Sequence, residues 1–291
     1  MEQVLINIIL TASIYLIISQ SFVLLYQTTR FFNVAHAAII TLGGYFSYTF
    51  YKIFSYNIFS SILIGIFFSV LVAIILELVI YKPLRKKGVN SFLLLIASLG
   101  LYIIINNVIL IIWGAQTNIL RSSNIEAGIN IFSAYATNIQ VYTVVVIFLL
   151  LLFVRLILNY SKLGKQIKAI SSNPELANIF GVKSDRIILI SLVIGSILAA
   201  IVGILVSFDT DLTPNMGFNL LLYGIVAMII GGVGNIYGLV GGAFLLSMTQ
   251  HLGAYYFDGK WMDAIAFIIL ILFLVWKPLG LSGNKLKKTQ I

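Results

Sequence analysis

Long apolar runs follow one another along the chain, separated by short polar segments. A helix that spans a membrane needs roughly 20 mostly apolar residues. The second of the nine candidate runs contains Gly43-Gly44, and the seventh is short and ends at Gly231-Gly232, so either could be a broken or re-entrant span. The pattern predicts an all-α polytopic membrane protein with about 8–9 transmembrane helices. The nine runs are Val4–Tyr26, Phe31–Tyr56, Ile58–Tyr81, Ser91–Trp113, Val141–Tyr160, Arg186–Ser207, Phe218–Ile230, Leu239–Phe257 and Trp261–Trp276.

The composition excludes a soluble protein. Of the 291 residues, 60% are hydrophobic and only 9% are charged, whereas soluble domains carry about 25% charged residues. The absence of cysteine excludes disulfide bonds and thiolate metal sites. A net charge of +9 does not indicate a nucleic acid partner here, because the basic residues lie between apolar runs, where membrane orientation explains them.

Basic residues are distributed unequally between alternate connections of the nine runs. One set of connections holds 15 of the 18 basic residues, and the other set holds Lys52, Arg121 and Lys260. Because cytoplasmic connections are enriched in Lys and Arg, we expect the N-terminus outside, the C-terminus cytoplasmic and the protein in the cell (inner) membrane. The richer set comprises Arg30, Lys82, Arg85, Lys86, Lys87, Arg155, Lys162, Lys165, Lys168, Lys183, Arg186, Lys277, Lys285, Lys287 and Lys288.

The spans lack the residues that a proton pump or a metal enzyme needs. No charged residue lies at the middle of a span, and Glu77 lies near the cytoplasmic end, one turn from Lys82, where it can pair or reach the interface. His36 and His251 have no cluster of carboxylates or cysteines around them, so no metal site is predicted. A phosphate-binding Gly-x-x-x-x-Gly-Lys-Ser/Thr run is also absent. We expect no catalytic residue, metal or cofactor in this chain.

The polar residues inside the spans are neutral. Such side chains form hydrogen bonds between helices, and they could also line a path for a neutral or zwitterionic solute. They are Ser19, Gln20, Ser21, Ser98, Asn106, Asn107, Ser196, Ser247, Thr249 and Gln250.

The longest cytoplasmic connection, residues 161–185, contains signals for a short helix. Asn173 is a good N-cap, Pro174 suits the first helical position and Glu175 favours the positive end of the helix dipole. Gly181 suits a left-handed C-terminal cap. The sequence therefore predicts a helix over Pro174–Phe180.

A helix of about two turns is too short to be stable alone in water, so it must pack on something. Leu176, Ile179 and Phe180 give it one apolar side, while Glu175 and Asn178 stay polar. This side could lie on lipid headgroups or insert into a groove of a cytoplasmic partner. The residues alone leave both open.

Three stretches of the chain resemble the integral-membrane permeases of ATP-binding-cassette (ABC) importers, in the branched-chain amino acid group. They contain Phe32–Ala37 with Leu42–Tyr45, then Leu163–Ala169 with Asn173–Gly181 and Gly195–Gly203, then Pro214 and Gly217 with Gly231–Gly238 and Gly241-Gly242. The length resembles the shorter of the two permease types. Ala37 stands where the family pattern usually has glycine.

The resemblance implies a single transmembrane permease domain over residues 1–291 that works with a second permease subunit, two cytoplasmic ATPase subunits and an external solute-binding protein. It implies that the helix at Pro174–Phe180 couples to an ATPase, through Gly164, Asn173, Pro174, Glu175, Leu176, Ala177, Ile179, Phe180 and Gly181. Residues expected to line the pathway or to pack helices closely are Asn33, His36, Gly43, Gly44, Gly231, Gly232 and Gly234.

Within the external connection, residues 114–139, the segment Asn118–Asn138 is expected to meet the binding protein, because it mixes Arg121, Glu126 and small polar residues. An ordinary external loop is the alternative. The expected cargo is a branched-chain or related amino acid, and urea, short amides, nucleosides or a sugar remain alternatives within the same architecture. An intramembrane enzyme that uses His36 or His251 with a serine is the alternative from another class.

Overall fold

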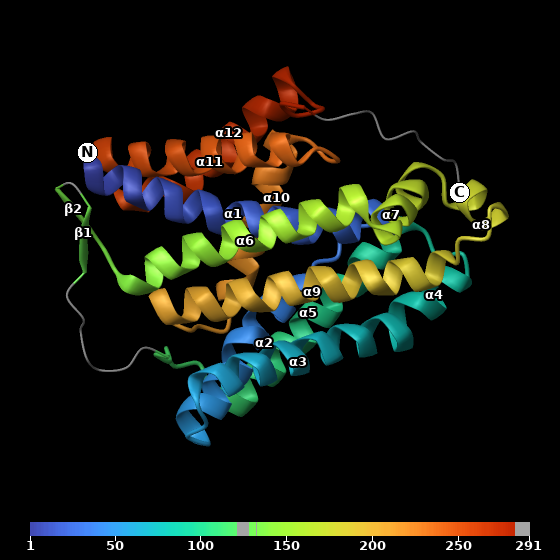
Figure 1. Ribbon diagram of the computed structural model, residues 1–291, viewed down its shortest axis with the longest axis horizontal. Helices are drawn as coiled ribbons and strands as arrows, with labels where there is room; N and C mark the ends of the chain where they lie inside the picture. The colour runs from blue at the N-terminus through green and yellow to red at the C-terminus, as the bar shows by residue number, and fades with distance from the viewer. Residues whose placement is uncertain (121–127, 132, 283–291) are drawn as a thin grey trace. The chain divides into compact units, whose positions relative to one another are not determined.

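The computed structural model describes residues 1–120, 128–131 and 133–282, and it is almost entirely helical (Figure 1). The described residues form two compact units, each built from separate parts of the chain: unit 1 from residues 1–23, 128–131, 133–156 and 222–282, and unit 2 from residues 24–120 and 157–221. The elements are α1 (Glu2–Thr29), α2 (His36–Tyr48), η1 (Thr49–Ile53), α3 (Ile58–Leu76), η2 (Glu77–Tyr81), α4 (Lys82–Lys86), α5 (Ser91–Trp113), β1 (Ile129–Ile131), β2 (Ala134–Ala136), α6 (Asn138–Tyr160), α7 (Lys162–Ser172), α8 (Pro174–Ile179), α9 (Ser184–Asp209), α10 (Met216–Gly231), α11 (Ile236–Tyr256), η3 (Gly259–Trp261) and α12 (Met262–Trp276).

Six helical stretches in the described part of the chain are long and apolar enough to span a membrane, and α10 with α11 adds a seventh if the bent pair is one span. The prediction of an all-α polytopic membrane protein is confirmed at this level, with one short antiparallel hairpin, β1–β2, added to it. Six of the nine predicted runs coincide with the six stretches. The other three are α2, α10 and α11.

The second predicted run differs from its expectation. Residues 30–35 are not helical, and α2 begins only at His36 and passes into the π-helical turn η1. The helix continues through Gly43-Gly44, so the possible break that was left open at this glycine pair is not found there. Nearly every residue of α2 is buried, because α3 and α9 pack against it.

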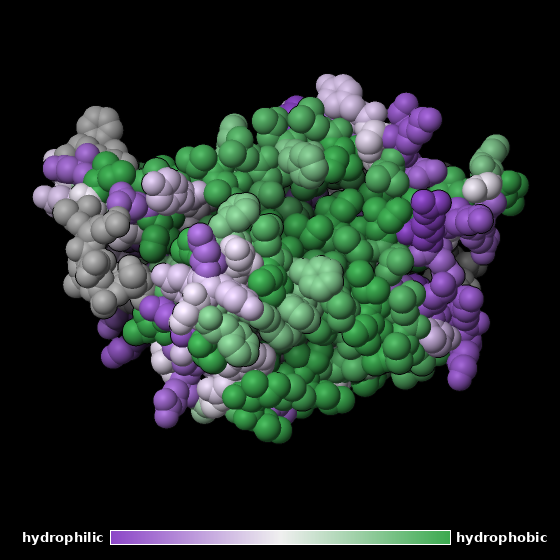
Figure 2. All heavy atoms as spheres, turned by 60° about the horizontal axis from the view of Figure 1, so that its bottom comes forward, coloured by the Kyte–Doolittle hydropathy of each residue, from purple (hydrophilic) through white to green (hydrophobic). Residues whose placement is uncertain are grey.

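Helix α3 shows how a membrane helix reverses the usual pattern of burial. Its buried residues are small and recur every fourth position, at Ser61, Gly65, Ser69 and Ala73. Its large apolar side chains point outward, at Phe59, Leu63, Phe67, Leu71 and Ile75. Small residues let helices approach closely, and lipid solvates the large ones. Figure 2 shows hydrophobic side chains covering most of the face that it presents.

Glycines allow α2 and α9 of unit 2 to meet backbone to backbone. A Cβ atom on Gly43 would lie 2.6 Å from the carbonyl oxygen of Ala200, and a Cβ on Gly203 would collide with the carbonyl oxygen of Ile40. Gly43 of α2 thus contacts the backbone of α9, and Gly203 of α9 contacts the backbone of α2. Helix α2 is therefore the closely held centre of unit 2.

Contacts at helix ends define two opposite ends of unit 2. At one end, Tyr81 donates to Asn33 at 2.9 Å and Lys82 pairs with Asp185 at 3.6 Å. The α4 turn, α7 and α8 lie at this end (Figure 1). At the other end, Trp113 Nε1 donates to Thr49 Oγ1 at 2.8 Å, and the backbones of Asn118 and Leu212 are bridged. Successive helices of unit 2 therefore alternate in direction.

In unit 1, α10 and α11 turn by 120° at residues 232–235. Gly232 and Gly234 have φ angles of +90° and +106°, which glycine adopts at little cost. Asn235 then caps α11 by accepting from Tyr237 N at 3.0 Å. The expectation of a broken or re-entrant segment at Gly231-Gly232 is confirmed, and the two glycines that follow Gly231 act in the turn.

Candidate functional site

The predicted short helix exists as α8, with Phe180 as its C-cap. The Asn173 Oδ1 atom accepts hydrogen bonds from the backbone N–H groups of Glu175 and Leu176, at 3.0 and 3.1 Å. Pro174 occupies the first turn, where no N–H is needed. The predicted N-terminal cap is therefore confirmed.

The C-terminal end of α8 closes as a Schellman motif. The N–H of Val182 donates to the carbonyl of Ala177, and the N–H of Gly181 donates to the carbonyl of Asn178, both at 3.0 Å. Gly181 has a φ of +82°, as a left-handed cap requires. The Asn178 side chain then accepts from both the backbone and the hydroxyl of Ser184, the first residue of α9. These bonds leave α8 little freedom relative to α9.

A small apolar core fixes α8 on its inner side. Ala177 is buried with Ile167 and Ile170 of α7 and with Ile187 of α9. Gly164 is also buried. A Cβ atom at this position would collide with the carbonyl oxygen of Leu158, so the backbone can approach this closely only with glycine. Gly164 and Ala177 therefore act as scaffold residues and are not available for direct contact with a partner.

The outer side of α8 is apolar and open. Ile179 is 82% exposed, Phe180 is 79% exposed and Leu176 is 50% exposed. These three residues form what we call the α8 patch. Lys165, Lys168 and Lys183 are exposed on the neighbouring turns. The structure thus separates the predicted residues into an inner set that holds the helix and an outer set that is free to bind.

The α8 patch is linked to the centre of unit 2 through α9. Ile187, in the first turns of α9, belongs to the core under α8, and Ala200 and Gly203 further along α9 meet α2 backbone to backbone. One continuous helix therefore joins the core under α8 to the contact with α2.

Of the predicted pathway residues, those at the start of α2 are held in a buried polar network. Asn33 Oδ1 accepts from the hydroxyl of Tyr81 at 2.9 Å, and Ser98 Oγ accepts from the N–H of Val34 at 3.0 Å. His36 is buried. Gly43 and Gly44 lie in tight helix contacts, where a Cβ on Gly44 would lie 2.8 Å from Leu212 Cδ1. These positions pack the helices of unit 2 together.

Several of the predicted neutral polar residues bond to another helix or to a neighbouring loop, and others, such as Thr249, bond within their own helix. Ser19 donates to the carbonyl of Gly224 at 2.7 Å, and Ser247 donates to the carbonyl of Ile8 at 2.9 Å. Asn106 donates to Asn215 Oδ1 at 3.0 Å. Asn107, expected to be buried, is exposed and donates to the carbonyl of Ile103 in its own helix.

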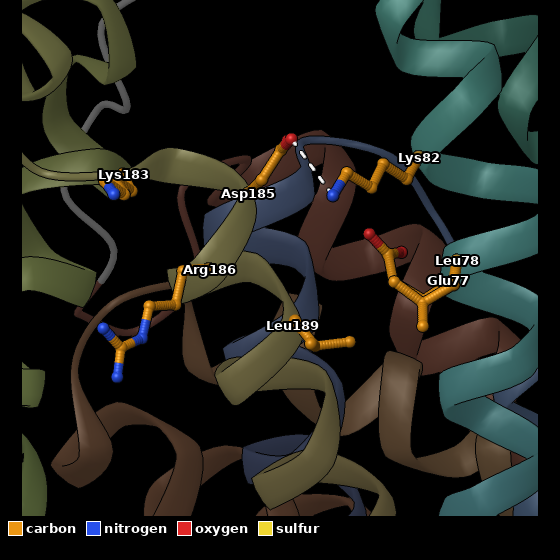
Figure 3. Close-up of a pocket in the computed structure, with 7 residues that line it drawn as sticks. All are labelled: Glu77, Leu78, Lys82, Lys183, Asp185, Arg186 and Leu189. Carbon is orange, nitrogen blue, oxygen red and sulfur yellow. Dashed lines mark ion pairs between the residues drawn. The ribbon is translucent and has the colours of Figure 1, made fainter.

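A cavity of about 320 Å³ opens between η2 and the first turns of α9 (Figure 3). We call it the charged cavity, and its lining residues are Glu77, Leu78, Lys82, Lys183, Asp185, Arg186 and Leu189. Glu77 is 1% exposed and forms an ion pair with Arg85, while Lys82 pairs with Asp185. The expected partner of Glu77 was Lys82. The π-helical turn η2 changes the register of the helix between them, which the sequence did not indicate.

The external connection is partly described. Within it, Asn118 is bridged to Leu212, and Tyr135 of the β-hairpin exchanges two 3.0 Å hydrogen bonds with the side chain of Gln3. Arg121 and Glu126, on which the expected contact with a binding protein depends, lie outside the described residues.

The family model and the curated relatives described next indicate the same family. The family described as "Branched-chain amino acid transport system / permease component" matches residues 4–274. The high-affinity branched-chain amino acid transport system permease protein LivH of Salmonella typhimurium is 26% identical over 96% of this chain and 94% of its own. The high-affinity branched-chain amino acid transport system permease protein BraD of Pseudomonas aeruginosa is 26% identical over 97% of this chain and 95% of its own.

More distant comparisons extend this likeness. A probable branched-chain amino acid transport permease protein LivH of Methanocaldococcus jannaschii is 26% identical over 97% of this chain and 92% of its own. Among solved structures, PsaBC from Streptococcus pneumoniae in complex with Fab matches with a TM-score of 0.52 and 14% identity, over 92% of this chain and 90% of that one. At this identity the structural match concerns the fold alone.

Proposed function

Because the chain belongs to the family of branched-chain amino acid transport system permease components, we propose that it is a permease subunit of an ATP-driven importer of branched-chain or related amino acids. It is a multi-pass membrane protein. The observation that carries the coupling part of this proposal is the α8 patch. Three apolar side chains stand exposed on a two-turn helix that the rest of unit 2 holds firmly.

The α8 patch docks into a groove on a cytoplasmic ATPase subunit. Exposed aromatic and aliphatic side chains on a short helix are suited to a groove of this kind. Two such ATPases, a second permease subunit and an external solute-binding protein complete the importer, and the connection at residues 114–139 meets the binding protein. Hydrolysis takes place on the ATPases, so this subunit needs neither a catalytic residue nor a cofactor.

The end of unit 2 that carries α4, α7 and α8 faces the cytoplasm. Lys82 and Arg85 lie in α4, Lys165 and Lys168 lie in α7, and Lys183 is the N-cap of α9. Basic residues favour the cytoplasmic side. Alternation of the helices then places the N-terminus outside and the C-terminus inside. Nine crossings satisfy this arrangement, with α2, α10 and α11 each counted as a crossing, whereas eight crossings would place both termini on the same side.

The cargo is an aliphatic zwitterion that a binding protein delivers. The names of the relatives support this cargo. Urea, a short amide, a nucleoside or a sugar are the alternatives within the same architecture.

Uptake by a reconstituted complex tests the proposal. The permease pair, the ATPases and the binding protein are placed in proteoliposomes, and labelled L-leucine uptake is measured with ATP and with a non-hydrolysable analogue. We expect accumulation only with ATP and binding protein. Uptake of urea or a nucleoside, without uptake of leucine, would show that the cargo is one of the alternatives. Accumulation of solute without the ATPases would refute the proposed coupling to ATP hydrolysis.

A further inference from the structure

The charged cavity has the size of a site for a small ligand. Its volume of about 320 Å³ lies at the lower end of the roughly 300–1,000 Å³ that small-molecule sites occupy. It is open to the surface, because the side chains of Lys82 and Asp185 at its mouth are 33% and 45% exposed. A ligand can therefore reach it from the side of the molecule that carries α8.

The lining of this cavity combines both signs of charge with aliphatic surface. Figure 3 shows Glu77 directing its carboxylate toward the side chain of Lys82, and Lys82 reaching Asp185. Leu189 extends into the space between α9 and η2, on the side opposite the charged mouth. The Lys82–Asp185 pair is long, at 3.6 Å, so a bound ligand can replace it at little cost.

These features select among possible ligands by charge. Lys183 and Arg186 also line the cavity, but Figure 3 shows their charged groups directed away from Lys82. The Glu77 carboxylate is held by Arg85. An anion such as phosphate would meet the carboxylate of Asp185, and a simple cation would meet Lys82. A zwitterion satisfies both signs, because its carboxylate can bind the Lys82 ammonium while its own ammonium lies against the Asp185 carboxylate. The leucines at positions 78 and 189 provide an apolar wall for an aliphatic side chain.

We propose that the charged cavity is a cytoplasmic binding site for an aliphatic amino acid, of the same chemical class as the imported solute. This inference rests on the proposed function for the class of ligand and for the side of the membrane. The site is separate from the α8 patch, since the two sets of residues do not overlap.

Occupation of this site restrains import. The cavity lies between η2 and the first turns of α9, and α9 is the element that connects the α8 core with α2. A ligand that bridges Lys82 and Asp185 braces the start of α9 against η2. Because a ligand shifts a conformational equilibrium by its differential affinity for the two states, product that accumulates in the cytoplasm would slow further uptake.

The experiment uses the whole complex in proteoliposomes loaded with L-leucine or, as a control, with L-lysine. Uptake of labelled L-leucine from outside is measured as initial rate against the internal concentration. We expect saturating internal leucine to slow the wild-type complex by about fivefold or more. Leu189→Trp fills the cavity and should abolish the dependence of the initial rate on internal leucine, whatever the rate of this variant without internal leucine.

Two further variants separate the cavity from general effects. Val79→Trp, at an exposed neighbouring position that does not line the cavity, should keep the inhibition. Asp185→Asn should weaken leucine binding to the detergent-purified complex, measured by calorimetry without binding protein, by about tenfold. Equal inhibition in the wild type and in Leu189→Trp would overturn the proposal, as would wild-type import that internal leucine does not slow.

The outcome is distinguishable from failure of the proposed function. If the complex imports leucine but internal leucine has no effect, only the cytoplasmic site is refuted. If the complex does not import leucine in liposomes free of internal solute, the proposed cargo is refuted first.

Discussion

Asn178 and Ser184 are joined by two hydrogen bonds, in which Asn178 Oδ1 accepts from the backbone N–H at 3.2 Å and from the hydroxyl at 2.7 Å. One residue lies in the last turn of α8 and the other begins α9. The bonds fix the angle between α8 and α9. Under our proposal they make α9 move together with α8 when the ATPase displaces α8.

Replacing Asn178 with alanine should uncouple the two helices without removing the α8 patch. Each lost bond contributes about 0.5–1.5 kcal/mol at most, so folding in the membrane is retained. We expect the ATPase to co-purify as with the wild type while uptake falls several-fold. Asn178→Asp, which keeps the acceptor oxygen, is the matched control and should restore uptake. Equal uptake in both variants would show that this connection need not be rigid.

The left-handed cap at Gly181 predicts a sharp dependence on residue type. A β-branched residue at a φ of +82° costs on the order of 1–2 kcal/mol, whereas asparagine tolerates this conformation. Gly181→Val should therefore speed proteolysis of the 173–183 segment and lower ATPase association, and Gly181→Asn should do neither. No neighbouring atom lies within 4 Å of an added Cβ, so identical behaviour of the two variants would contradict the cap.

The close contact between α2 and α9 predicts a second contrast. A Cβ on Gly203 would collide with the Ile40 carbonyl, whereas nothing lies within 4 Å of a Cβ on Gly100 in α5. Gly203→Ala should destabilise the protein by about 1–3 kcal/mol through overpacking. Gly100→Ala should be neutral or slightly stabilising, because alanine favours helix. Thermal unfolding in detergent measures both, and a Gly203→Ala variant as stable as the wild type would refute the contact.

The proposed orientation can be tested directly, because the chain has no native cysteine. Single cysteines are introduced at Ser172, in α7, and at Lys52, in η1, both of which are exposed. An impermeant thiol reagent added to intact cells should label the cysteine at position 52 and should reach the one at position 172 only after permeabilisation. Labelling at position 172 in intact cells would show that the proposed orientation is wrong.

The helix α8 could be predicted from the sequence because its determinants are local. Asn173, Pro174 and Gly181 act on backbone groups within a few residues, and each does so in the structure. The six apolar stretches were predicted for the same reason, since length and hydropathy are properties of a single segment.

The remaining features depend on contacts between distant residues or on a local change of register. The start of α2 could not be predicted, because a helix enclosed by α3 and α9 does not need the hydropathy of a lipid-facing one. The pair of Glu77 with Arg85 depends on the π-helical turn between them. The charged cavity depends on the contact between Lys82 and Asp185, which lie in two helices far apart in the sequence. The pattern of hydrophobic residues does not predict such a contact.

The central claim is that the α8 patch transmits the work of an ATPase to the permease, and Phe180 tests it most directly. Truncation of an aromatic anchor can cost about 2 kcal/mol of binding, or roughly 30-fold in affinity. Phe257→Ala is the matched control, because Phe257 is equally exposed, at 79%, and follows α11 in unit 1.

The decisive measurement is ATP-driven uptake of labelled L-leucine, with co-purification of the ATPase, for Phe180→Ala and Phe257→Ala in the same preparation. The account predicts that Phe180→Ala folds and inserts normally, loses ATPase association and abolishes uptake, while Phe257→Ala retains both. Full ATPase association and wild-type uptake in Phe180→Ala would show that α8 is only a surface helix and would contradict the coupling mechanism.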